Sequence, residues 1–270
     1  MPNNLPEETI DFIFCLIDKD DEDNHNMFLT WRYVNKQFAR ILIPRVFRVI
    51  NLKPFLSPFK HNYFQDSLEF FFVHDHIALC VRKLVIWGPS KSRGGFKSDT
   101  RGVLTSTTLS RFLSMFLHLQ ALQLIDLIFS TTEIYLDNTI RDHPSSFTSL
   151  VLSNVDLDSA SLYSQQSPFF PPSLRDFTVT FTMWPTLLQA AYEEYRTHPL
   201  SITSACTHTS AATQLFSTLN QLKHLHVYHH DSKHEPQVVV AITNNEATLE
   251  TLSICMDENC AWLKIGRAHV

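Results

Sequence analysis

Two segments decide the fold: Leu119-Gln120-Ala121-Leu122-Gln123-Leu124 and, 28 residues further on, Phe147-Thr148-Ser149-Leu150-Val151-Leu152. Both carry large apolar side chains at the first, fourth and sixth positions and smaller or polar ones between them. In an extended strand, alternate side chains point to opposite faces, so the fourth and sixth positions share one face. Each segment therefore predicts a strand that buries one face and leaves the other open.

The same apolar-x-x-apolar-x-apolar pattern occurs seven times. It begins at residues 47, 81, 119, 147, 174, 222 and 249, which gives separations of 34, 38, 28, 27, 48 and 27 residues. Three of these fall in the range of about 20 to 29 residues that leucine-rich repeats have. Residues 49–264 thus resemble a degenerate leucine-rich-repeat solenoid, and the resemblance implies an α/β fold with a curved parallel sheet.

The segments between the strands leave room for helices. Apolar residues before the third pattern recur at helical spacing, and two further apolar segments fill the longest interval. Segments 88–102 and 165–173 are rich in Ser, Pro, Gly and Lys and predict surface loops. The helical positions are Leu109, Phe112, Leu113, Phe116 and Leu117, then Leu187 to Tyr195 and Leu215 to Leu219.

The first fifty residues predict a compact helical unit. Pro6 suits the first position of a helix, and apolar residues follow at helical spacing from Ile10 to Ile17. A second apolar run at helical spacing extends from Phe28 to Leu42, and Pro44 is expected to end it.

This unit resembles an F-box of the form common in fungal F-box-like proteins. The residues that carry the resemblance are Leu5-Pro6-Glu7-Glu8, Ile10, Ile13, Val34-Asn35-Lys36-x-Phe38 and Val46-Phe47-Arg48-Val49-Ile50. The resemblance implies a small three-helix module over residues 1–48 that binds the Skp-type adaptor of a cullin–RING ubiquitin ligase. On the matching positions, that contact would use Leu5, Pro6, Ile10, Ile13, Val34 and Phe38. The alternative is that these side chains pack inward as core.

The alternation of the strands assigns a second surface. Residues between the buried positions are expected on the concave, solvent-facing side of the sheet, where Trp87, Ile125 and Tyr228 would be exposed anchors for a protein substrate. The alternative is that they pack under loops. The expected substrate face comprises Lys83, Val85, Trp87, Gln123, Ile125, Thr178, His224, His226 and Tyr228.

Charge and composition exclude several classes of protein. With 44% hydrophobic and 18% charged residues, the chain is neither a disordered tail nor a coiled coil. Residues 1–30 hold eight acids and one lysine, whereas residues 31–60 hold seven basic residues and no acid. The net charge is −5, so a basic face that docks on an acidic protein fits better than nucleic-acid binding. No segment is apolar enough to span a membrane, and we expect a cytoplasmic or nuclear protein.

No motif for catalysis or a cofactor stands out. Five glycines leave no phosphate-binding loop, and no serine or cysteine has the local signature of a nucleophile. Fourteen histidines include a cluster from His224 to His234 and the pair His74 and His76, but the spacing of zinc ligands is missing. We expect no metal, no cofactor and no enzymatic activity, with a histidine-metal hydrolase as a remote alternative.

The last six residues, 265–270, resemble the translation of a short sequencing adapter. They are expected to be a non-native tail, and the repeat domain is then expected to be truncated at its C-terminus. The sequence favours a substrate-recruiting adaptor of a ubiquitin ligase. The alternative is a leucine-rich-repeat scaffold that no longer binds the ligase.

Overall fold

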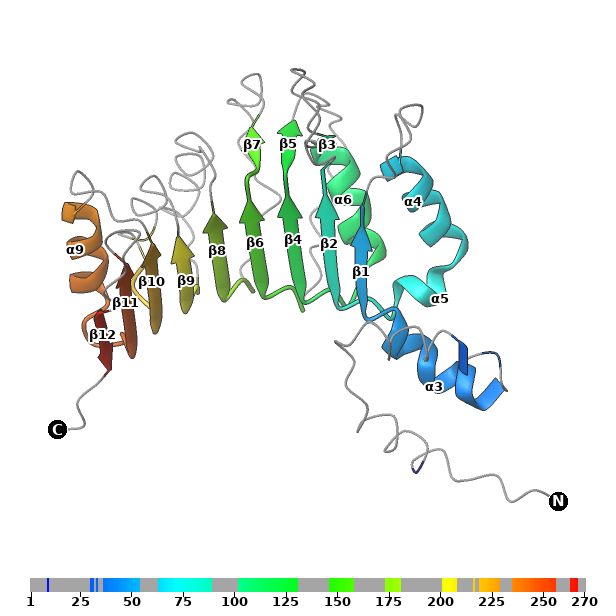
Figure 1. Cartoon of the computed structure of the whole chain (residues 1–270), viewed down its shortest axis with the longest axis horizontal. Coiled ribbons are helices and arrows are strands. Elements are labelled where there is room, and N and C mark those ends of the chain that lie inside the picture. The colour runs from blue at the N-terminus through cyan, green and yellow to red at the C-terminus, as the bar shows by residue number, and fades with distance from the viewer. Residues whose placement is uncertain are drawn as a thin grey trace.

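A nine-stranded sheet forms the body of the molecule in the computed structural model (Figure 1). The structure describes residues 9, 30, 31, 33, 36–53, 63–88, 102–130, 146–157, 173–180, 201–207, 216, 219–228, 235–255 and 263–266. The strands follow one another across the sheet in chain order, and every pair is parallel except the last. They are β1 (Val49–Leu52), β2 (Lys83–Trp87), β4 (Ala121–Ile125), β6 (Ser149–Ser153), β8 (Asp176–Thr180), β9 (Ser204–Thr207), β10 (His224–Tyr228), β11 (Thr251–Cys255) and β12 (Leu263–Gly266).

The prediction of an α/β fold with a mostly parallel sheet is confirmed, and each of the seven sequence patterns supplies one strand. The apolar pattern did not predict β9, which lies within the long interval between the patterns at 174 and 222. There, Ile202, Ala205 and Thr207 occupy the three buried positions, and all three are fully buried. Small and polar residues at the second and third positions hid the pattern. With a start at residue 202, the interval of 48 residues becomes 28 and 20.

Two rows of side chains cross the sheet in register and form the core. In each pair of parallel strands, the two residues of the first row are register partners. The residues of the second row lie two positions further along each strand and are paired in the same way. Because parallel strands are about 4.8 Å apart, each side chain contacts its neighbours in the same row. The first row is Ile50, Leu84, Leu122, Leu150, Phe177, Ala205, Leu225 and Leu252, and the second is Leu52, Ile86, Leu124, Leu152, Val179, Thr207, Val227 and Ile254.

One backbone hydrogen-bond pattern recurs where each strand begins. The carbonyl oxygen of the residue before a strand accepts two bonds, from two successive N–H groups of the next strand's start. For example, Gln120 accepts from Thr148 at 2.9 Å and from Ser149 at 3.0 Å. Among the described residues, the pattern links seven successive strand pairs, with the accepting carbonyls at Arg48, Arg82, Gln120, Thr148, Arg175, Thr203 and Lys223.

Side-chain hydroxyls reinforce three of these junctions. Ser146 donates to the carbonyl of Leu119 at 2.9 Å, and Thr248 donates to that of Leu222 at 2.8 Å. Ser173 donates to the carbonyl of Phe147 in the same way. In each case the hydroxyl precedes the first apolar residue of one pattern and bonds to the first apolar residue of the pattern before it. Equivalent positions along the chain are thus tied together by equivalent bonds.

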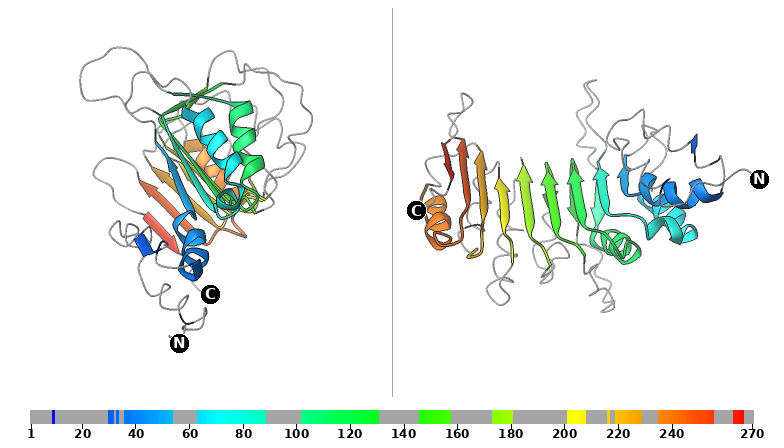
Figure 2. Two further views of the ribbon diagram at one scale, coloured as in Figure 1. Left: turned by 90° about the vertical axis from the view of Figure 1, so that its right-hand side faces the viewer. Right: turned by 90° about the horizontal axis from the view of Figure 1, so that it is seen from below.

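Helices cover one side of the sheet. Figure 2 shows α4 (Tyr63–Val73), α6 (Ser106–Met115) and α9 (Glu235–Asn244) on the same side, with the short α5 (Asp75–Ala78) beside α4. The predicted helix before the third pattern is confirmed as α6. Its Leu109 and Phe112 are fully buried. Phe116, which follows the last helical residue, is also fully buried, whereas Leu117 beyond it is exposed. No helix in the described part of the chain is both long enough and apolar enough to cross a membrane.

A second sheet of three short parallel strands continues past the first: β3 (Gly102–Thr105), β5 (Leu127–Ser130) and β7 (Asp156–Leu157). The chain turns from β4 to β5 at Asp126 and from β6 to β7 at Asn154, which have left-handed φ values of 55° and 51°. Asp and Asn tolerate this conformation better than most residues. Asn154 Nδ2 donates to Asp126 Oδ1 at 2.6 Å, so one turn fixes the next. At the same corner, a Cβ on Gly88 would lie 1.8 Å from the carbonyl oxygen of Asp126.

Helix α3 (Lys36–Val46) corrects the prediction that Pro44 ends the second apolar run. Pro44 lies inside the helix, two residues before its end, where it removes a single helical hydrogen bond. The burial of Val46 in a small cluster with Ile41 and Leu42 compensates for that loss. The segment from Leu187 to Tyr195 lies outside the described residues. So do the predicted helix from Pro6 to Ile17, except Thr9, and the predicted loop 165–173, except Ser173.

Strand β12 pairs antiparallel with β11 and includes Ile265 and Gly266 of the predicted non-native tail. An open sheet edge accepts an extended segment through backbone hydrogen bonds alone, whatever its sequence. The pairing therefore says nothing about the origin of these residues, and the non-native tail stays a prediction.

Candidate protein-interaction surfaces

The N-terminal surface is described only at α3 and the residues just before it. Of the six residues predicted to contact an adaptor, Phe38 lies in α3, while Leu5, Pro6, Ile10, Ile13 and Val34 lie outside the described residues. Phe38 is half-buried and packs with Trp31 against the cluster of Ile41, Leu42 and Val46. Its ring thus contributes to the local core and also keeps part of its surface open.

The open face of the nine-stranded sheet carries the residues predicted to meet a substrate. Strand register places Lys83 beside Ala121, Val85 beside Gln123 and Trp87 beside Ile125. Further along, Thr178 on β8 is paired with Cys206 on β9, which is paired in turn with His226 on β10. The structure therefore brings the predicted positions of β2, β4, β8 and β10 onto one face.

Two residues of this face were predicted to be exposed and are not. Val85 is 4% exposed and Ile125 is 8% exposed. Val85 is surrounded by longer side chains, with Asn51 and Gln123 on the neighbouring strands and Lys83 and Trp87 along its own. Ile125 lies beside Trp87 and directly before the left-handed turn at Asp126. A short aliphatic side chain among larger ones, such as Val85, is shielded even on the open face of a sheet. Ile125 lies between Trp87 and Ser153 and is buried where the chain turns into β5, so it is no exposed anchor.

The other predicted residues keep surface available. Lys83 is exposed, while Trp87, Gln123, Thr178, His224 and His226 are half-buried. The ammonium group of Lys53 lies 5.3 Å from the centre of the Trp87 ring, a cation–π contact that orients the indole. Tyr228 belongs to β10 and pairs with Cys255 through the backbone, but its side chain lies outside the described part. The face thus combines one oriented aromatic ring with hydroxyl, amide and imidazole groups.

Cys206, the thiol that the structure describes on this face, has low reactivity. Burial raises the pKa of Cys206 to about 11, because a thiolate would lose its hydration between Thr178 and His226. The thiol is therefore protonated at neutral pH, and a protonated thiol is a poor nucleophile and metal ligand. This environment favours a packing role for Cys206 over a catalytic one.

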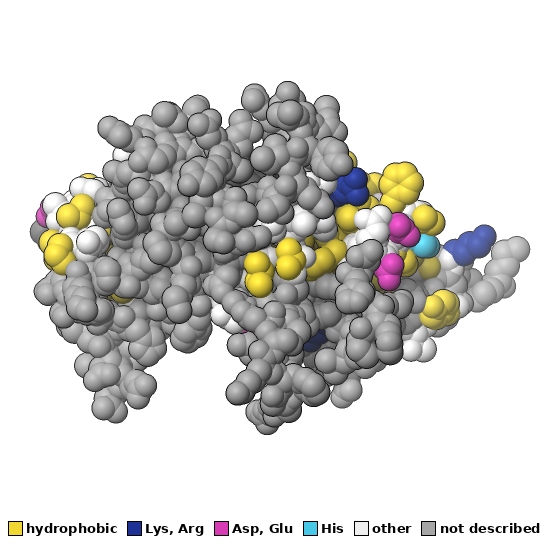
Figure 3. Space-filling view, turned by 90° about the horizontal axis from the view of Figure 1, so that it is seen from above, with side chains coloured by type: hydrophobic (Ala, Val, Ile, Leu, Met, Phe, Trp, Pro, Cys, Tyr) yellow, Lys and Arg dark blue, Asp and Glu magenta, His cyan; other side chains and the backbone are white. Residues whose placement is uncertain are grey.

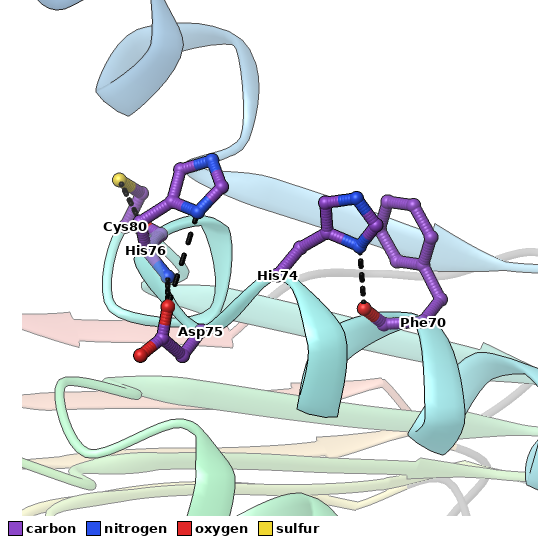
Figure 4. Close-up of polar contacts among 5 residues, drawn as sticks. All are labelled: Phe70, His74, Asp75, His76 and Cys80. Atoms are coloured by element: carbon purple, nitrogen blue, oxygen red, sulfur yellow. Dashed lines mark hydrogen bonds and ion pairs between the residues drawn. The ribbon is translucent and has the colours of Figure 1, made fainter.

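The pair His74 and His76 lies at the junction of α4 and α5 (Figure 4). His74 precedes α5 and His76 lies within it, and the centres of the two imidazole rings are 6.1 Å apart. His74 Nδ1 contacts the carbonyl of Phe70 at 2.9 Å, and its ring stacks on that of Phe70. Across the described residues, no group of three or more His, Cys, Asp or Glu side chains is placed to hold a metal ion.

Sequence analysis missed an apolar surface on α4. Phe72 is 80% exposed and Val73 is 72% exposed, with Phe70 and Leu79 partly exposed nearby. Figure 3 shows hydrophobic side chains reaching the surface at this end of the molecule. The signal was present in the sequence as Phe70-Phe71-Phe72-Val73, because four consecutive apolar residues on a helix cannot all face one side. Phe71 takes the buried position, at 3% exposure.

Comparison with known proteins adds no assignment. No protein-family model matches the chain, and no curated protein matches its sequence. The surfaces described above are therefore the basis for a function.

Proposed function

We propose that this protein is a substrate-recruiting adaptor subunit of a cullin–RING ubiquitin ligase. In this scheme, residues 1–48 form an F-box-like module that binds a Skp-type adaptor. Residues 49–264 form a degenerate leucine-rich-repeat domain that holds a protein substrate on the open face of its sheet. The protein needs no active site of its own, because it acts by bringing the substrate close to the catalytic subunits.

The repeat interpretation rests on one recurring observation. At seven successive strand pairs, one carbonyl accepts two N–H groups of the next strand, and apolar side chains stand in register behind it. In solenoids, each unit contacts mainly its neighbours and buries its apolar face by stacking. The recurrence of one backbone pattern in chain order is what such stacking requires, and it supports the proposal.

The adaptor-binding half rests on the sequence resemblance, with support from α3. This helix carries the Lys36-x-Phe38 part of the motif, has its own small core and ends at Val46, with two residues between it and β1. In the described part of this unit, the buried cluster comprises Ile41, Leu42 and Val46. A short helical unit with a small core gains stability from a partner's helices. The alternative scaffold function shares the repeat domain and differs only in lacking adaptor binding.

A pull-down on immobilised Skp-type adaptor tests the proposal. The full chain is compared with the Leu5→Ala/Pro6→Ala/Ile10→Ala variant. The matched control is Leu117→Ala/Val239→Ala/Val240→Ala, which removes three exposed apolar side chains far along the chain. We expect binding by the wild type and the control, and loss of binding in the first variant while its circular dichroism is unchanged. If the folded wild type does not bind at tens of micromolar, roughly −6 kcal/mol, the scaffold function takes its place.

A further inference from the structure

The described residue that precedes each strand of the parallel sheet carries a positive charge at four of eight positions. The bifurcated hydrogen bonds align these residues along the edge at which the strands begin. In order they are Arg48, Arg82, Gln120, Thr148, Arg175, Thr203, Lys223 and Glu250. We call Arg48, Arg82, Arg175 and Lys223 the basic edge row. The chain as a whole carries −5, so this row is a local concentration of the opposite sign.

The basic edge row faces water. Arg48, Arg175 and Lys223 are exposed, and Arg82 is half-buried. Lys83, the next residue after Arg82, is exposed as well and adds a fifth positive charge. Among the described residues, two acids adjoin the row in sequence or by contact: Asp176, which follows Arg175, and Glu250, whose Oε1 is 3.4 Å from Lys223 Nζ. Within this part of the chain, five positive charges against two negative ones leave a net positive edge.

Two guanidinium groups of the row are held in place by the backbone. Arg82 Nη1 donates to the carbonyls of Leu79 and Val81, at 2.8 and 3.2 Å. Arg175 Nη1 donates in the same manner to Leu174 and Ser201, at 3.2 and 3.3 Å. A guanidinium has five N–H donors in a rigid plane and binds carboxylates in paired fashion. Fixing the group beforehand lowers the entropy lost when a carboxylate binds.

We infer that the basic edge row binds an extended, Asp- or Glu-rich segment of the protein substrate. From Arg48 to Lys223 the row crosses six strand spacings of about 4.8 Å each, or about 29 Å, which about nine extended residues would span. Alternate side chains of such a segment point to one side and can reach the row together. Electrostatic complementarity of this kind fixes register and speeds association. The inference rests on the proposed function, since it names the substrate class.

Fluorescence anisotropy with a labelled 12-residue peptide of alternating Glu and Ser tests this, using the full chain at about 50 mM salt, where charges are weakly screened. The comparison peptide alternates Lys and Ser. We expect binding of the acidic peptide that weakens as salt rises, and at least about a tenfold weaker affinity for Arg48→Gln/Arg82→Gln/Arg175→Gln. The matched control, Lys36→Gln/Arg40→Gln/Arg111→Gln, removes the same charge from exposed positions on α3 and α6 and should retain affinity. Equal losses in both variants, or equal binding of both peptides, would overturn the inference.

Two further variants distinguish binding by the basic edge row from misfolding and from competition by the chain's own acidic segment. Arg48→Glu/Lys83→Glu changes exposed side chains only, so it reports on the row if loss of the Arg82 bonds prevents folding. The chain's own acidic residues from Asp18 to Asp23 are a competing occupant. Asp20→Asn/Asp21→Asn/Glu22→Gln/Asp23→Asn should leave the peptide affinity unchanged, and a tenfold rise would assign the row to that segment instead. If the chain binds the adaptor but not the peptide, only this inference is contradicted. If it binds the peptide but not the adaptor, the ligase role is contradicted.

Discussion

The two faces of the nine-stranded sheet follow different rules. On the inner face, two in-register rows of mostly apolar side chains are buried, with Ile50, Leu52 and Ile254 near the ends of the sheet only partly so. Periodicity predicted their positions in every parallel strand except β9. On the open face, burial varies from residue to residue, so that Lys83 is exposed while Val85, two positions away, is 4% exposed. The inner face is determined by the pattern of the chain, and the open face by the sizes of neighbouring side chains. Stability should therefore reside in the first and recognition in the second.

The largest difference between the faces is expected at adjacent residues of β8. Phe177 is 1% exposed and meets the ring of Phe216 edge-on, with 6.2 Å between ring centres. Phe177→Ala should lower the free energy of unfolding by about 3 to 5 kcal/mol, because it leaves a cavity in the core. Thr178→Ala, on the open face, should change it by no more than about 0.5 kcal/mol. Urea unfolding of both variants measures this, and similar losses at the two positions would contradict the division.

A smaller effect is expected at Asn245, a buried polar residue on the inner side. Its Oδ1 accepts from the N–H of Leu222 at 2.7 Å, and its Nδ2 donates to the carbonyls of Leu219 and Ala241 at 2.6 and 2.7 Å. Asn245→Ala leaves three buried backbone groups without this partner and should cost about 3 kcal/mol. The exposed Asn220 provides the control, and Asn220→Ala should cost under about 0.5 kcal/mol. A neutral Asn245→Ala in urea unfolding would show that the backbone groups find other partners.

The smallest of these stability effects is expected within the open face, between a shielded and an exposed valine. Val85→Ala should lower the free energy of unfolding by about 1.5 kcal/mol, since two buried methyl groups are lost. Val49 lies on the same face but is 43% exposed, and Val49→Ala should cost clearly less. Thermal and urea unfolding of the pair distinguishes shielding by neighbours from simple alternation. Equal losses near zero in both variants would support the prediction that alternation alone decides which side chains are exposed.

Periodicity predicted the inner face because apolar residues at fixed spacing leave few other ways to bury them. It failed at β9, where Ala205 and Thr207 fill buried positions that larger apolar residues occupy elsewhere. It also failed for Val85 and Ile125, because a one-dimensional pattern does not show which side chains lie alongside on neighbouring strands. The basic edge row needed the structure for the same reason: Arg48, Arg82 and Arg175 are far apart in sequence and come together only through strand register.

Calorimetric titration of a Skp-type adaptor into the full chain, with one variant of each surface, tests the recruiting function directly. We expect a one-to-one complex with a dissociation constant of tens of micromolar or tighter. The Leu5→Ala/Pro6→Ala/Ile10→Ala variant should lose that binding. An Arg82→Gln/Arg175→Gln variant should keep it, because both residues lie outside the module of residues 1–48. A folded wild-type chain that gives no binding heat, and no complex by sedimentation, would contradict the recruiting function.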